Sequence, residues 1–412
     1  MQQDGSPFRW AVGIEDTFIP QVRRNGRKLD EYELTDHYAQ WRSDLQIAAD
    51  SGADTMRYGI PWYRVNPEPG RFDWEWTDRV LEHLVQTVRI TPIIDLVHYG
   101  CPLWLEREFI HPDYPERVAE YAHAFADRYR EFVSWYTPLN EPRINARACG
   151  RNGTWPPYLR GDRGYLRVML PIARGMSLTV AALRDAQPNA TIVGVEAAEA
   201  IVTDDPTLTE ERAFQAEQQY LATDLLLGRV DDGHVLHEWL VTNGVAEADL
   251  EWLRAHAQTI DVAGVNFYPE LTRKVLVRAG DSVRRIRGGG WTGNLQALLR
   301  NWHERYGVPT MVTETSAVKN VRGRLRWLEE SVAAVAEIRR DGVPVIGYTW
   351  WPLFSLVAWS YRGGRKPLAA YVVHMGLWDL REVDGWLDRV RTPVADRFVE
   401  MTSGGERLGL TA

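Results

Sequence analysis

Eight short apolar runs, rich in β-branched residues, alternate with longer segments of helical period along this chain. They cover residues 8–14, 55–60, 91–97, 133–139, 191–195, 262–266, 309–313 and 345–349. Alternating strands and helices form a parallel sheet, and eight strands close a (β/α)8 barrel of the TIM type. We predict this α/β barrel as one domain over residues 1–412, because no repeat or Pro/Ser-rich linker divides the chain. An open, doubly wound sheet is the alternative.

The segments between the runs have the apolar spacing of helices. We expect helices at residues 34–52, 76–89, 115–131, 165–186, 208–227, 294–306, 325–340 and 392–401. The first should have its N-cap at Thr35 and end at Gly52, since these residue types are common at such positions. The arginine-rich stretch at residues 284–287 is expected on a solvated loop or helix face.

Polar or aromatic residues lie at or near the carboxyl end of every predicted strand. In barrel enzymes the chemistry is carried by the loops that follow the strands. Barrel closure would bring these ends together, which makes the residues there the functional candidates. They are Glu15, Arg57, His98, Asn140, Glu141, Glu196, Asn266, Tyr268, Glu314, Trp350 and Trp351.

Two of these candidates, Glu141 and Glu314, each end an apolar run. Cleavage of a glycosidic bond needs two such carboxyl groups: one protonates the leaving oxygen, and the other stays ionised and faces the sugar carbon. Pro142 restricts the chain beyond Glu141 and favours an extended backbone at Glu141 itself. Asn140 could donate an amide hydrogen bond to a sugar hydroxyl such as the 2-OH. A helix cap is the alternative interpretation of the Asn-Glu pair.

Charge and composition narrow the range of partners. The formal net charge is −8, the sequence pI is near 5.8, and there is no long basic run, which argues against nucleic acid or an anionic membrane as a partner. The chain has 18 Trp and 17 Tyr, whose rings can stack on the C–H faces of sugars, although most rings of this kind pack in a core. A small-molecule glycoside or an oligosaccharide is the expected partner, and nothing indicates an oligomeric state.

Cysteine usage and motif spacing bear on location and cofactors. Two cysteines, Cys101 and Cys149, imply no disulfide framework. No basic-then-apolar leader begins the sequence and no apolar run reaches 18 residues, so we expect a cytoplasmic protein without a membrane span. No metal-ligand spacing is present, and the glycines at 288–290 lack the Lys-Ser/Thr of a phosphate-binding loop. We therefore predict neither a metal nor a cofactor.

Seven segments together resemble family 1 glycoside hydrolases, the β-glucosidase-like members of a clan of retaining (β/α)8 glycosidases. They are residues 8–12 (FRWAV), 55–62 (TMRYGIPW), 92–102 (PIIDLVHYGCP), 136–142 (YTPLNEP), 264–268 (GVNFY), 312–315 (VTET) and the region 351–359. The resemblance implies a retaining β-glycosidase. Glu141 would be the acid/base and Glu314 the nucleophile that forms a covalent glycosyl-enzyme.

The resemblance also implies supporting roles. Arg57 and Tyr268 would hold Glu314 ionised, by a nearby positive charge and a phenolic hydrogen bond. The substrate-binding residues would be His98, Asn140, Trp351, Trp359 and Glu15. His98 would bond a ring hydroxyl, Trp351 would form a platform beneath the sugar, and Glu15 lies where the family presents a glutamine. The alternatives are a core ion pair for Arg57, a loop histidine for His98 and a core ring for Trp351.

Departures from the family concern the sugar. Typical members carry a glutamate just before the second tryptophan of the eighth strand, where this chain has Ala358, preceded by Leu356 and Val357. The residues after the nucleophile are Thr315 and Ser316, not Asn-Gly. We therefore expect a retaining β-glycosidase whose −1 sugar is altered at C4 or C6 and is not plain glucose. A transglycosidase with the same residues and a non-catalytic carbohydrate-binding barrel are the alternatives.

Overall fold

The fold is a closed barrel of eight parallel strands. The computed structural model describes residues 8–384 and 386–404. In chain order the barrel strands are β1 (Arg9–Gly13), β4 (Thr55–Gly59), β5 (Thr91–Asp95), β6 (Trp135–Thr137), β7 (Thr191–Ala197), β9 (Val262–Phe267), β12 (Thr310–Thr315) and β13 (Val345–Trp350). They close in the order β1-β13-β12-β9-β7-β6-β5-β4. Each strand lies in or overlaps one predicted run, so the (β/α)8 prediction is confirmed and the open sheet is wrong.

The strands are apolar on both faces because both faces are covered. Inside the barrel, Ala11, Ile93, Val193, Val262 and Met311 form one buried cluster. A larger cluster fills the space between the strands and the surrounding helices. A strand buried on both sides has no polar face, which is why these segments appear in the sequence as continuous apolar runs.

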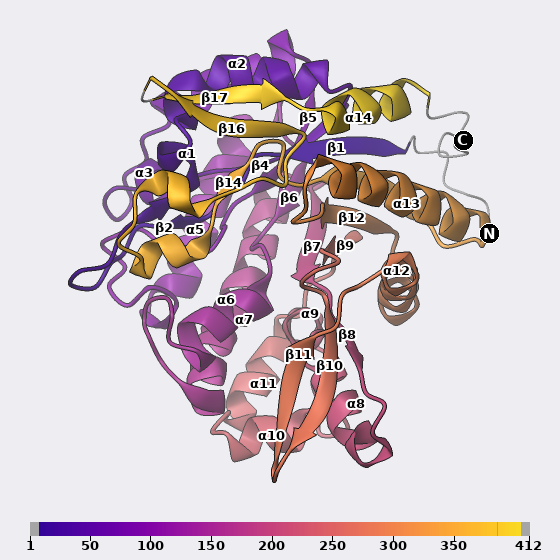
Figure 1. Ribbon diagram of the computed structural model, residues 1–412. Coiled ribbons are helices and arrows are strands. Elements are labelled where there is room, and N and C mark those ends of the chain that lie inside the picture. The colour runs from indigo at the N-terminus through magenta and orange to yellow at the C-terminus, as the bar shows by residue number, and fades with distance from the viewer. Residues whose placement is uncertain (1–7, 385, 405–412) are drawn as a thin grey trace.

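Helices surround the barrel (Figure 1). They are α1 (Glu31–Leu34), α2 (His37–Asp50), α3 (Trp62–Val65), α4 (Glu75–Glu82), α5 (Tyr114–Tyr129), α6 (Pro142–Ala146), α7 (Gly161–Ala186), α8 (Thr209–Glu217), α9 (Leu221–Leu226), α10 (His237–Thr242), α11 (Glu247–Ala255), α12 (Thr292–Tyr306), α13 (Val321–Arg340) and α14 (Pro393–Ser403). Two π-helical turns, His83–Thr87 and Arg147–Arg151, continue α4 and α6, and 3₁₀ turns lie at Glu108–Ile110, Pro206–Leu208, Trp359–Gly363 and Leu368–Tyr371.

Two helix predictions need correction. Thr35 does not cap α2: its hydroxyl and its amide both donate to the Glu31 carbonyl, so it closes α1, and α2 begins only at His37. The segment 208–227 is two helices, α8 and α9, separated by a turn. Gln219 in that turn accepts a hydrogen bond from the Glu199 amide. The turn lets all of α9 be buried, whereas no residue of α8 is.

Helix α7 is long and apolar enough to cross a membrane by length and composition alone. In the structure, 61% of its most apolar window is buried inside the protein. Val168, Met169 and Ile172 on this helix belong to the main core cluster. The burial accounts for the apolar composition as that of a core helix.

Short sheets extend the loops around the barrel. β2 (Phe18–Ile19) pairs with β3 (Leu29–Asp30), and β14 (Leu356–Val357) pairs with β15 (Val372–Val373). β8 (Ala200–Val202), β10 (Arg273–Ala279) and β11 (Ser282–Arg287) form a three-stranded sheet after β7 and β9, which stands off the barrel in Figure 1. β16 (Trp378–Val383) pairs with β17 (Trp386–Arg391). All but the last pair follow the carboxyl ends of barrel strands, where they can shape a site.

Candidate active site

A cavity of about 520 Å³ opens at the carboxyl ends of the barrel strands. Seven of the predicted candidates line it: Glu15, His98, Glu141, Asn266, Tyr268, Glu314 and Trp359. They come from loops and strand ends spread between residues 15 and 359. Barrel closure therefore brings together what the sequence separates, as the strand-end pattern predicts.

Glu314 is the fifth residue of β12 and lies at an irregularity of the sheet. The register of β12 against β9 shifts between Val312 and Glu314. A bulge of this kind re-aims a side chain, and bulges are common beside active sites. Arg57 Nη1 donates to Glu314 Oε1 at 2.8 Å, and the Tyr268 hydroxyl donates to Oε2 at 2.6 Å. The predicted contacts of Arg57 and Tyr268 with this carboxyl group are both present.

Arg57 is itself fully buried and holds several groups at once. Nη1 also donates to the Thr313 carbonyl at 2.9 Å, while Nη2 donates to Asn140 Oδ1 at 3.0 Å and to Asp95. Its pKa is raised well above the usual value, because Asp95 and Glu314 outweigh the effect of burial. Arg57 is thus both a buried ion-pair partner of Asp95 and a hydrogen-bond donor to the Glu314 carboxyl group.

Glu141 does not have the extended backbone that Pro142 led us to expect. Its φ is 45° and its ψ is 59°, in the left-handed region, and it is the N-cap of α6. The residue turns the chain from β6 directly into α6, and Pro142 occupies the first helical position, where its missing N–H has no consequence. Left-handed backbone at a non-glycine residue is strained, and strain of this kind recurs at functional sites.

The carboxyl group of Glu141 has only neutral hydrogen-bond partners. The Tyr99 hydroxyl donates to Oε2 at 2.5 Å, and Asn266 Nδ2 donates to Oε1 at 2.9 Å. Glu314 in contrast contacts the guanidinium of Arg57. The two carboxyl groups thus differ in one respect: only Glu314 has a cation in direct contact, and such a cation favours the ionised form.

The pKa of Glu314 is nevertheless raised, to about 8, and not held low. Burial is the largest cause; Arg57 opposes it, and the charge of Glu141 adds to the rise. Arg57 and Tyr268 both act against this rise, because each stabilises the Glu314 carboxylate.

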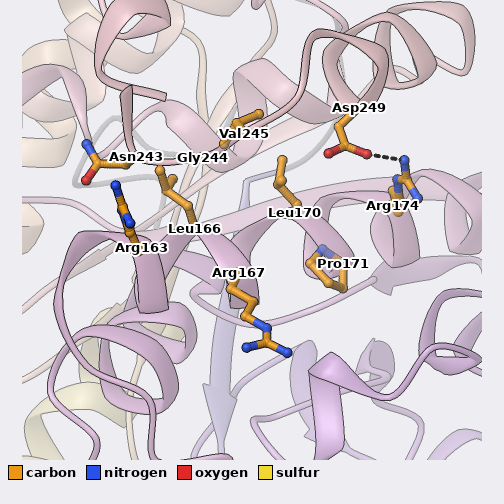
Figure 2. A pocket seen from close by; sticks show the side chains of 10 residues that line it. All are labelled: Arg163, Leu166, Arg167, Leu170, Pro171, Arg174, Asn243, Gly244, Val245 and Asp249. Carbon is orange, nitrogen blue, oxygen red and sulfur yellow. Dashed lines mark hydrogen bonds and ion pairs between the residues drawn. The ribbon is translucent and has the colours of Figure 1, made fainter. Parts of the chain in front are cut away.

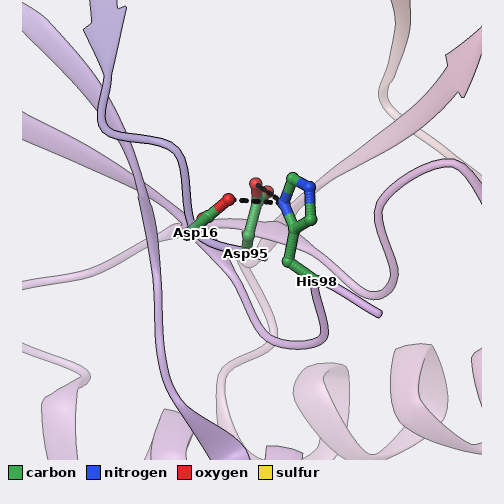
Figure 3. Close-up of side chains that lie close together, drawn as sticks. All are labelled: Asp16, Asp95 and His98. Atoms are coloured by element: carbon green, nitrogen blue, oxygen red, sulfur yellow. Dashed lines mark ion pairs between the residues drawn. The ribbon is translucent and has the colours of Figure 1, made fainter. Parts of the chain in front are cut away.

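His98 lies against two aspartates, Asp16 and Asp95 (Figure 3). Its Nδ1 is 2.5 Å from Asp16 Oδ1 and 3.5 Å from Asp95 Oδ2. Burial lowers the pKa of His98, but Asp16 outweighs burial and raises it well above its usual value. Nε2 is 3.0 Å from Asn140 Nδ2, which can donate only to an unprotonated nitrogen. The aspartates favour imidazolium, whereas Asn140 favours the neutral ring protonated at Nδ1.

Asn140 is completely buried and does not line the cavity. Its Oδ1 accepts from Arg57, and its Nδ2 donates to the Tyr99 hydroxyl at 3.0 Å. The amide therefore links the surroundings of Glu314 to those of Glu141. Contact between Asn140 and a sugar hydroxyl stays a prediction.

Trp351 and Glu15 act as a pair. The Trp351 indole N–H donates to Glu15 Oε2 at 3.0 Å, and its ring stacks parallel to His98 at a centroid distance of 5.9 Å. Trp351 is 1% exposed and lies under the residues that line the cavity. A Cβ at Gly13 would be 2.1 Å from this ring, so only glycine lets the indole approach β1. The platform role of Trp351 stays a prediction, and so does substrate binding by Glu15.

Trp359 presents an exposed ring to the cavity. It is 38% exposed and meets the rings of Tyr99 and Trp155 edge-on, at 5.5 and 4.9 Å. Tyr99, which bonds Glu141, was not among the sequence candidates, although it directly follows His98. Its backbone φ of 91° is set by the tertiary structure, and no local pattern indicated it.

One corner of the cavity is apolar. Leu356, Ala358, Val373 and Met375 line it, where the resemblance places a glutamate in other family members. Strand β14 carries Leu356 and pairs with β15, which carries Val373. This corner offers no hydrogen bond from a side chain to a sugar hydroxyl.

A second cavity lacks this chemistry. A cavity of about 560 Å³ lies outside the barrel, between α7 and the turn that joins α10 to α11 (Figure 2). Arg163, Arg167 and Arg174 line it, and Arg174 pairs with Asp249 at 2.6 Å. Its one lining carboxylate is thus neutralised, and the cavity has no pair of carboxyl groups.

Among the described residues, two clusters have ligand atoms close enough to hold a metal ion: Asp16, Asp95 and His98, and Glu217, Asp224 and His234. In the first, Arg57 already contacts Asp95. In the second, Arg305 pairs with both Glu217 and Asp224. In each cluster an arginine side chain therefore already pairs with at least one of the carboxylates. The absence of a metal stays a prediction.

Residues 10–281 match the family model described as glycosyl hydrolase family 1. The chain belongs to glycosyl hydrolase family 1. It is therefore a glycoside hydrolase, as the motifs led us to expect. This family 1 enzyme is 25% identical over 389 residues to an aryl-phospho-β-D-glucosidase of Bacillus subtilis, with 80% of this chain and 78% of the relative covered. It is 26% identical over 401 residues to a bifunctional β-D-glucosidase/β-D-fucosidase of Bifidobacterium breve, with 82% and 83% covered.

A solved structure shares the fold of this family 1 enzyme. The β-glucosidase from Thermotoga maritima in complex with deoxynojirimycin matches with a TM-score of 0.83 and 20% sequence identity. The match covers 98% of this chain and 99% of the other. At that identity the likeness bears on the barrel, and the sugar specificity has to be argued from the residues of the site.

Proposed function

We propose that this enzyme cleaves a β-glycosidic bond with retention, through a covalent glycosyl-enzyme on Glu314 and with Glu141 as acid/base. The observation that carries the proposal is the unequal surroundings of two carboxyl groups that line one cavity. Glu314 contacts a guanidinium, and Glu141 contacts only a hydroxyl and an amide. The retaining mechanism that is general in family 1 supports the same division of roles.

In the first step Glu141 donates its proton to the glycosidic oxygen while Glu314 attacks the anomeric carbon. The bond from that carbon to the leaving oxygen breaks, and an ester to Glu314 forms on the opposite face of the sugar. In the second step Glu141 takes a proton from water, and the resulting hydroxide displaces Glu314. Two inversions give net retention, and both carboxyl groups return to their starting states.

The reaction course can be tested by the configuration of the first product. A set of aryl β-glycosides should be turned over, and ¹H NMR should show the β-anomer of the free sugar before mutarotation mixes the anomers. Early appearance of the α-anomer would mean inversion and would overturn the proposal. Absence of turnover on every β-glycoside would favour a carbohydrate-binding barrel.

The role of Tyr268 gives a prediction with a pH readout. Its hydroxyl bonds Glu314 Oε2 and lowers the pKa of that carboxyl group. Tyr268→Phe should raise the pKa of Glu314, and because the nucleophile must be ionised, the acidic limb of kcat/KM against pH should move to higher pH. We expect kcat/KM at neutral pH to fall about 10- to 100-fold, the effect of losing one hydrogen bond to a charged group.

A matched control for Tyr268→Phe is available. Tyr136 is a buried tyrosine of β6 whose hydroxyl bonds Gln187, and it does not line the cavity. Tyr136→Phe should leave the pH profile in place. Equal shifts in both variants would indicate a general loss of packing.

For the sugar, we propose a −1 residue without the hydroxyl that other family members hold at C4 or C6. The support is the apolar corner at Leu356, Ala358, Val373 and Met375. A polar group placed there without a partner is destabilised, whereas a methyl group is not. The β-D-fucosidase activity in the name of the Bifidobacterium relative agrees with this proposal, because D-fucose carries a methyl group at C5 in place of the hydroxymethyl group of galactose.

We accordingly expect kcat/KM to be at least about tenfold higher on 6-deoxy β-glycosides than on the matching β-glucosides or β-galactosides. Ala358→Glu should shift the ratio back toward the unmodified sugars. Parallel kcat/KM measurements on matched 4-nitrophenyl glycosides decide the matter. A wild-type preference for plain glucose would show that another residue holds those hydroxyls.

A further inference from the structure

One side of the catalytic cavity is strongly basic. Arg147, Lys274 and Arg287 line it, and Arg143 and Arg285 lie behind them. We call these five residues the basic wall. Lys274, Arg285 and Arg287 belong to the hairpin β10–β11, so residues 284–287 form a strand and not the expected loop or helix; Arg284 and Arg287 are solvated as expected, whereas Arg285 is half-buried. Antiparallel pairing folds the hairpin so that alternate residues face the cavity.

The register of the hairpin places two cations side by side. Lys274 pairs directly with Arg287, and residues opposite each other in an antiparallel pair project from the same face. Like charges in that arrangement destabilise a sheet. Burial lowers the pKa of Lys274, and Arg147, Arg287 and Arg143 lower it further. The hairpin therefore brings positive charges together without enough negative charge to balance them.

Glu199 is the ionised carboxylate that the basic wall shares. It lies 3.0 Å from Arg143, and 3.4 Å from both Arg147 and Arg285. Lys274 Nζ is 3.9 Å from the same carboxylate. These cations together lower the pKa of Glu199 to about 2, so it remains charged.

Two further observations leave the basic wall in positive excess. Burial raises the pKa of the neighbouring Glu196 to about 8, so at neutral pH it contributes little charge. Within residues 8–384 and 386–404, the Arg287 guanidinium makes no hydrogen bond or ion pair, although it lines the cavity. Four cations thus share the Glu199 carboxylate, and the fifth, Arg287, has no ion-pair partner among the described residues.

The basic wall is on the side of the cavity that receives the leaving group. Glu141, which would protonate the leaving oxygen, begins the helix that leads into Arg147. Glu199 follows β7, which is four places from β1 in the closed order of eight and therefore opposite it. Glu15 and Trp351, which are expected to hold the sugar and which bond each other, follow β1 and β13 on the other side.

We propose that the basic wall binds a carboxylate carried by the aglycone, so that the enzyme acts on β-glycosides of acidic aglycones. The inference rests on the proposed function and names its substrate class. The cluster already holds one carboxylate, that of Glu199, through Arg143, Arg147 and Arg285. The unpaired Arg287 and the weakly paired Lys274 are free to bind a second at the cavity surface.

The aglycone that fits has an apolar body. Ile144, Ala197 and Leu271 line the same side of the cavity, from α6, the end of β7 and the loop after β9. An aromatic or aliphatic acid linked to the sugar through oxygen could contact these residues and extend its carboxylate to Lys274 and Arg287. A neutral aglycone of the same shape would leave the two cations without a partner.

The test compares 4-carboxyphenyl and 4-carbamoylphenyl β-glycosides, which have nearly the same shape and differ in charge. Wild-type kcat/KM should be at least about tenfold higher for the carboxylate, the effect of one charge-assisted contact. The preference should fall as NaCl is raised from about 0.02 to 0.5 M, since salt screens partly exposed charges. In the double variant Lys274→Gln, Arg287→Gln the ratio should approach one, with turnover of the neutral substrate within about threefold of wild type.

Arg284→Gln is the matched control. Arg284 is an exposed neighbour on β11 that does not line the cavity and lies on the opposite face from Arg285 and Arg287. This variant should keep the preference. The proposal is wrong if the wild type does not distinguish the two substrates, if the double variant keeps its preference, or if Arg284→Gln loses as much. An unfolding temperature of the double variant no lower than wild type shows that the fold is intact.

A binding experiment tests this inference independently of the proposed function. Free 4-hydroxybenzoate and 4-hydroxybenzamide can be titrated calorimetrically into the wild-type enzyme and the double variant. Tighter binding of the carboxylate by the wild type alone supports the basic wall even if no glycoside is turned over. Turnover without any carboxylate preference, in kinetics or in binding, would support the glycosidase activity and refute the proposal of an acidic aglycone.

Discussion

Glu314→Ala is expected to abolish turnover on every β-glycoside, including those with the best leaving groups. Without the carboxylate no glycosyl-enzyme can form, and the positive charge that develops at the anomeric carbon loses its nearest anion. We expect kcat to fall by at least about 10⁴-fold, a loss of about 5 kcal/mol of transition-state stabilisation. Steady-state rates on 2,4-dinitrophenyl glycosides measure the effect, and Glu314→Gln, which keeps the shape of the side chain, should behave in the same way.

The anomer of the glycosyl azide formed when azide is added distinguishes a lost nucleophile from a damaged fold. In Glu314→Ala, azide can enter the vacated space and attack the anomeric carbon from the face that Glu314 used. A β-glycoside should then give the α-glycosyl azide, identified by NMR. Residual turnover within about tenfold of wild type would show that Glu314 is not the nucleophile. Formation of the β-glycosyl azide would assign the other role to it.

Glu141→Ala should have an effect that depends on the leaving group. A poor leaving group needs the proton of Glu141, so kcat/KM on alkyl or unsubstituted phenyl glycosides should fall by about 10³- to 10⁴-fold. A 2,4-dinitrophenolate leaves without protonation, so kcat/KM on that substrate should stay within about tenfold of wild type. The glycosyl-enzyme should then accumulate as a burst, because no base activates the water of the second step.

Azide should accelerate that second step in Glu141→Ala, because an anion needs no general base. It attacks the glycosyl-enzyme from the face where water would enter, so the product is the β-glycosyl azide, the opposite anomer to that from Glu314→Ala. The two variants thus act as controls for each other. Equal losses of kcat/KM on activated and unactivated substrates would refute the assignment of Glu141 as acid.

The hydrogen-bond partners of Glu141 and Glu314 explain why substitution of the two residues should have opposite outcomes. Arg57 and Tyr268 donate to the two oxygens of Glu314, and Tyr99 and Asn266 donate to those of Glu141. The number of donors is the same, and the difference is the charge of one of them. Burial raises the pKa of Glu314, and Arg57 opposes that rise by stabilising the carboxylate that a nucleophile must present.

The local pattern of apolar residues predicted where the strands lie, and the ends of those strands predicted the catalytic candidates. A strand buried on both faces must be apolar throughout, and a residue that ends such a strand in a barrel faces the site, so the end of each run marked a candidate. Glu141, Glu314, His98 and Tyr268 were found in this way and line the cavity. The backbone of Glu141 was not, because Pro142 restricts its neighbour only statistically, and the turn from β6 into α6 imposed the left-handed conformation.

The sequence by itself determined the barrel, its eight strands and the two carboxyl groups, because period and strand ends are properties of short segments. Only the tertiary structure decided the partners of those groups. Arg57 and Glu314 are 257 residues apart, and Glu15 and Trp351 are 336 apart. The bond from Tyr99 to Glu141, the rise in the pKa of Glu314 and the basic wall depend on burial and on charges brought together from distant segments. Desolvation and Coulomb interactions act through space, so the spacing of residues along the chain does not encode them.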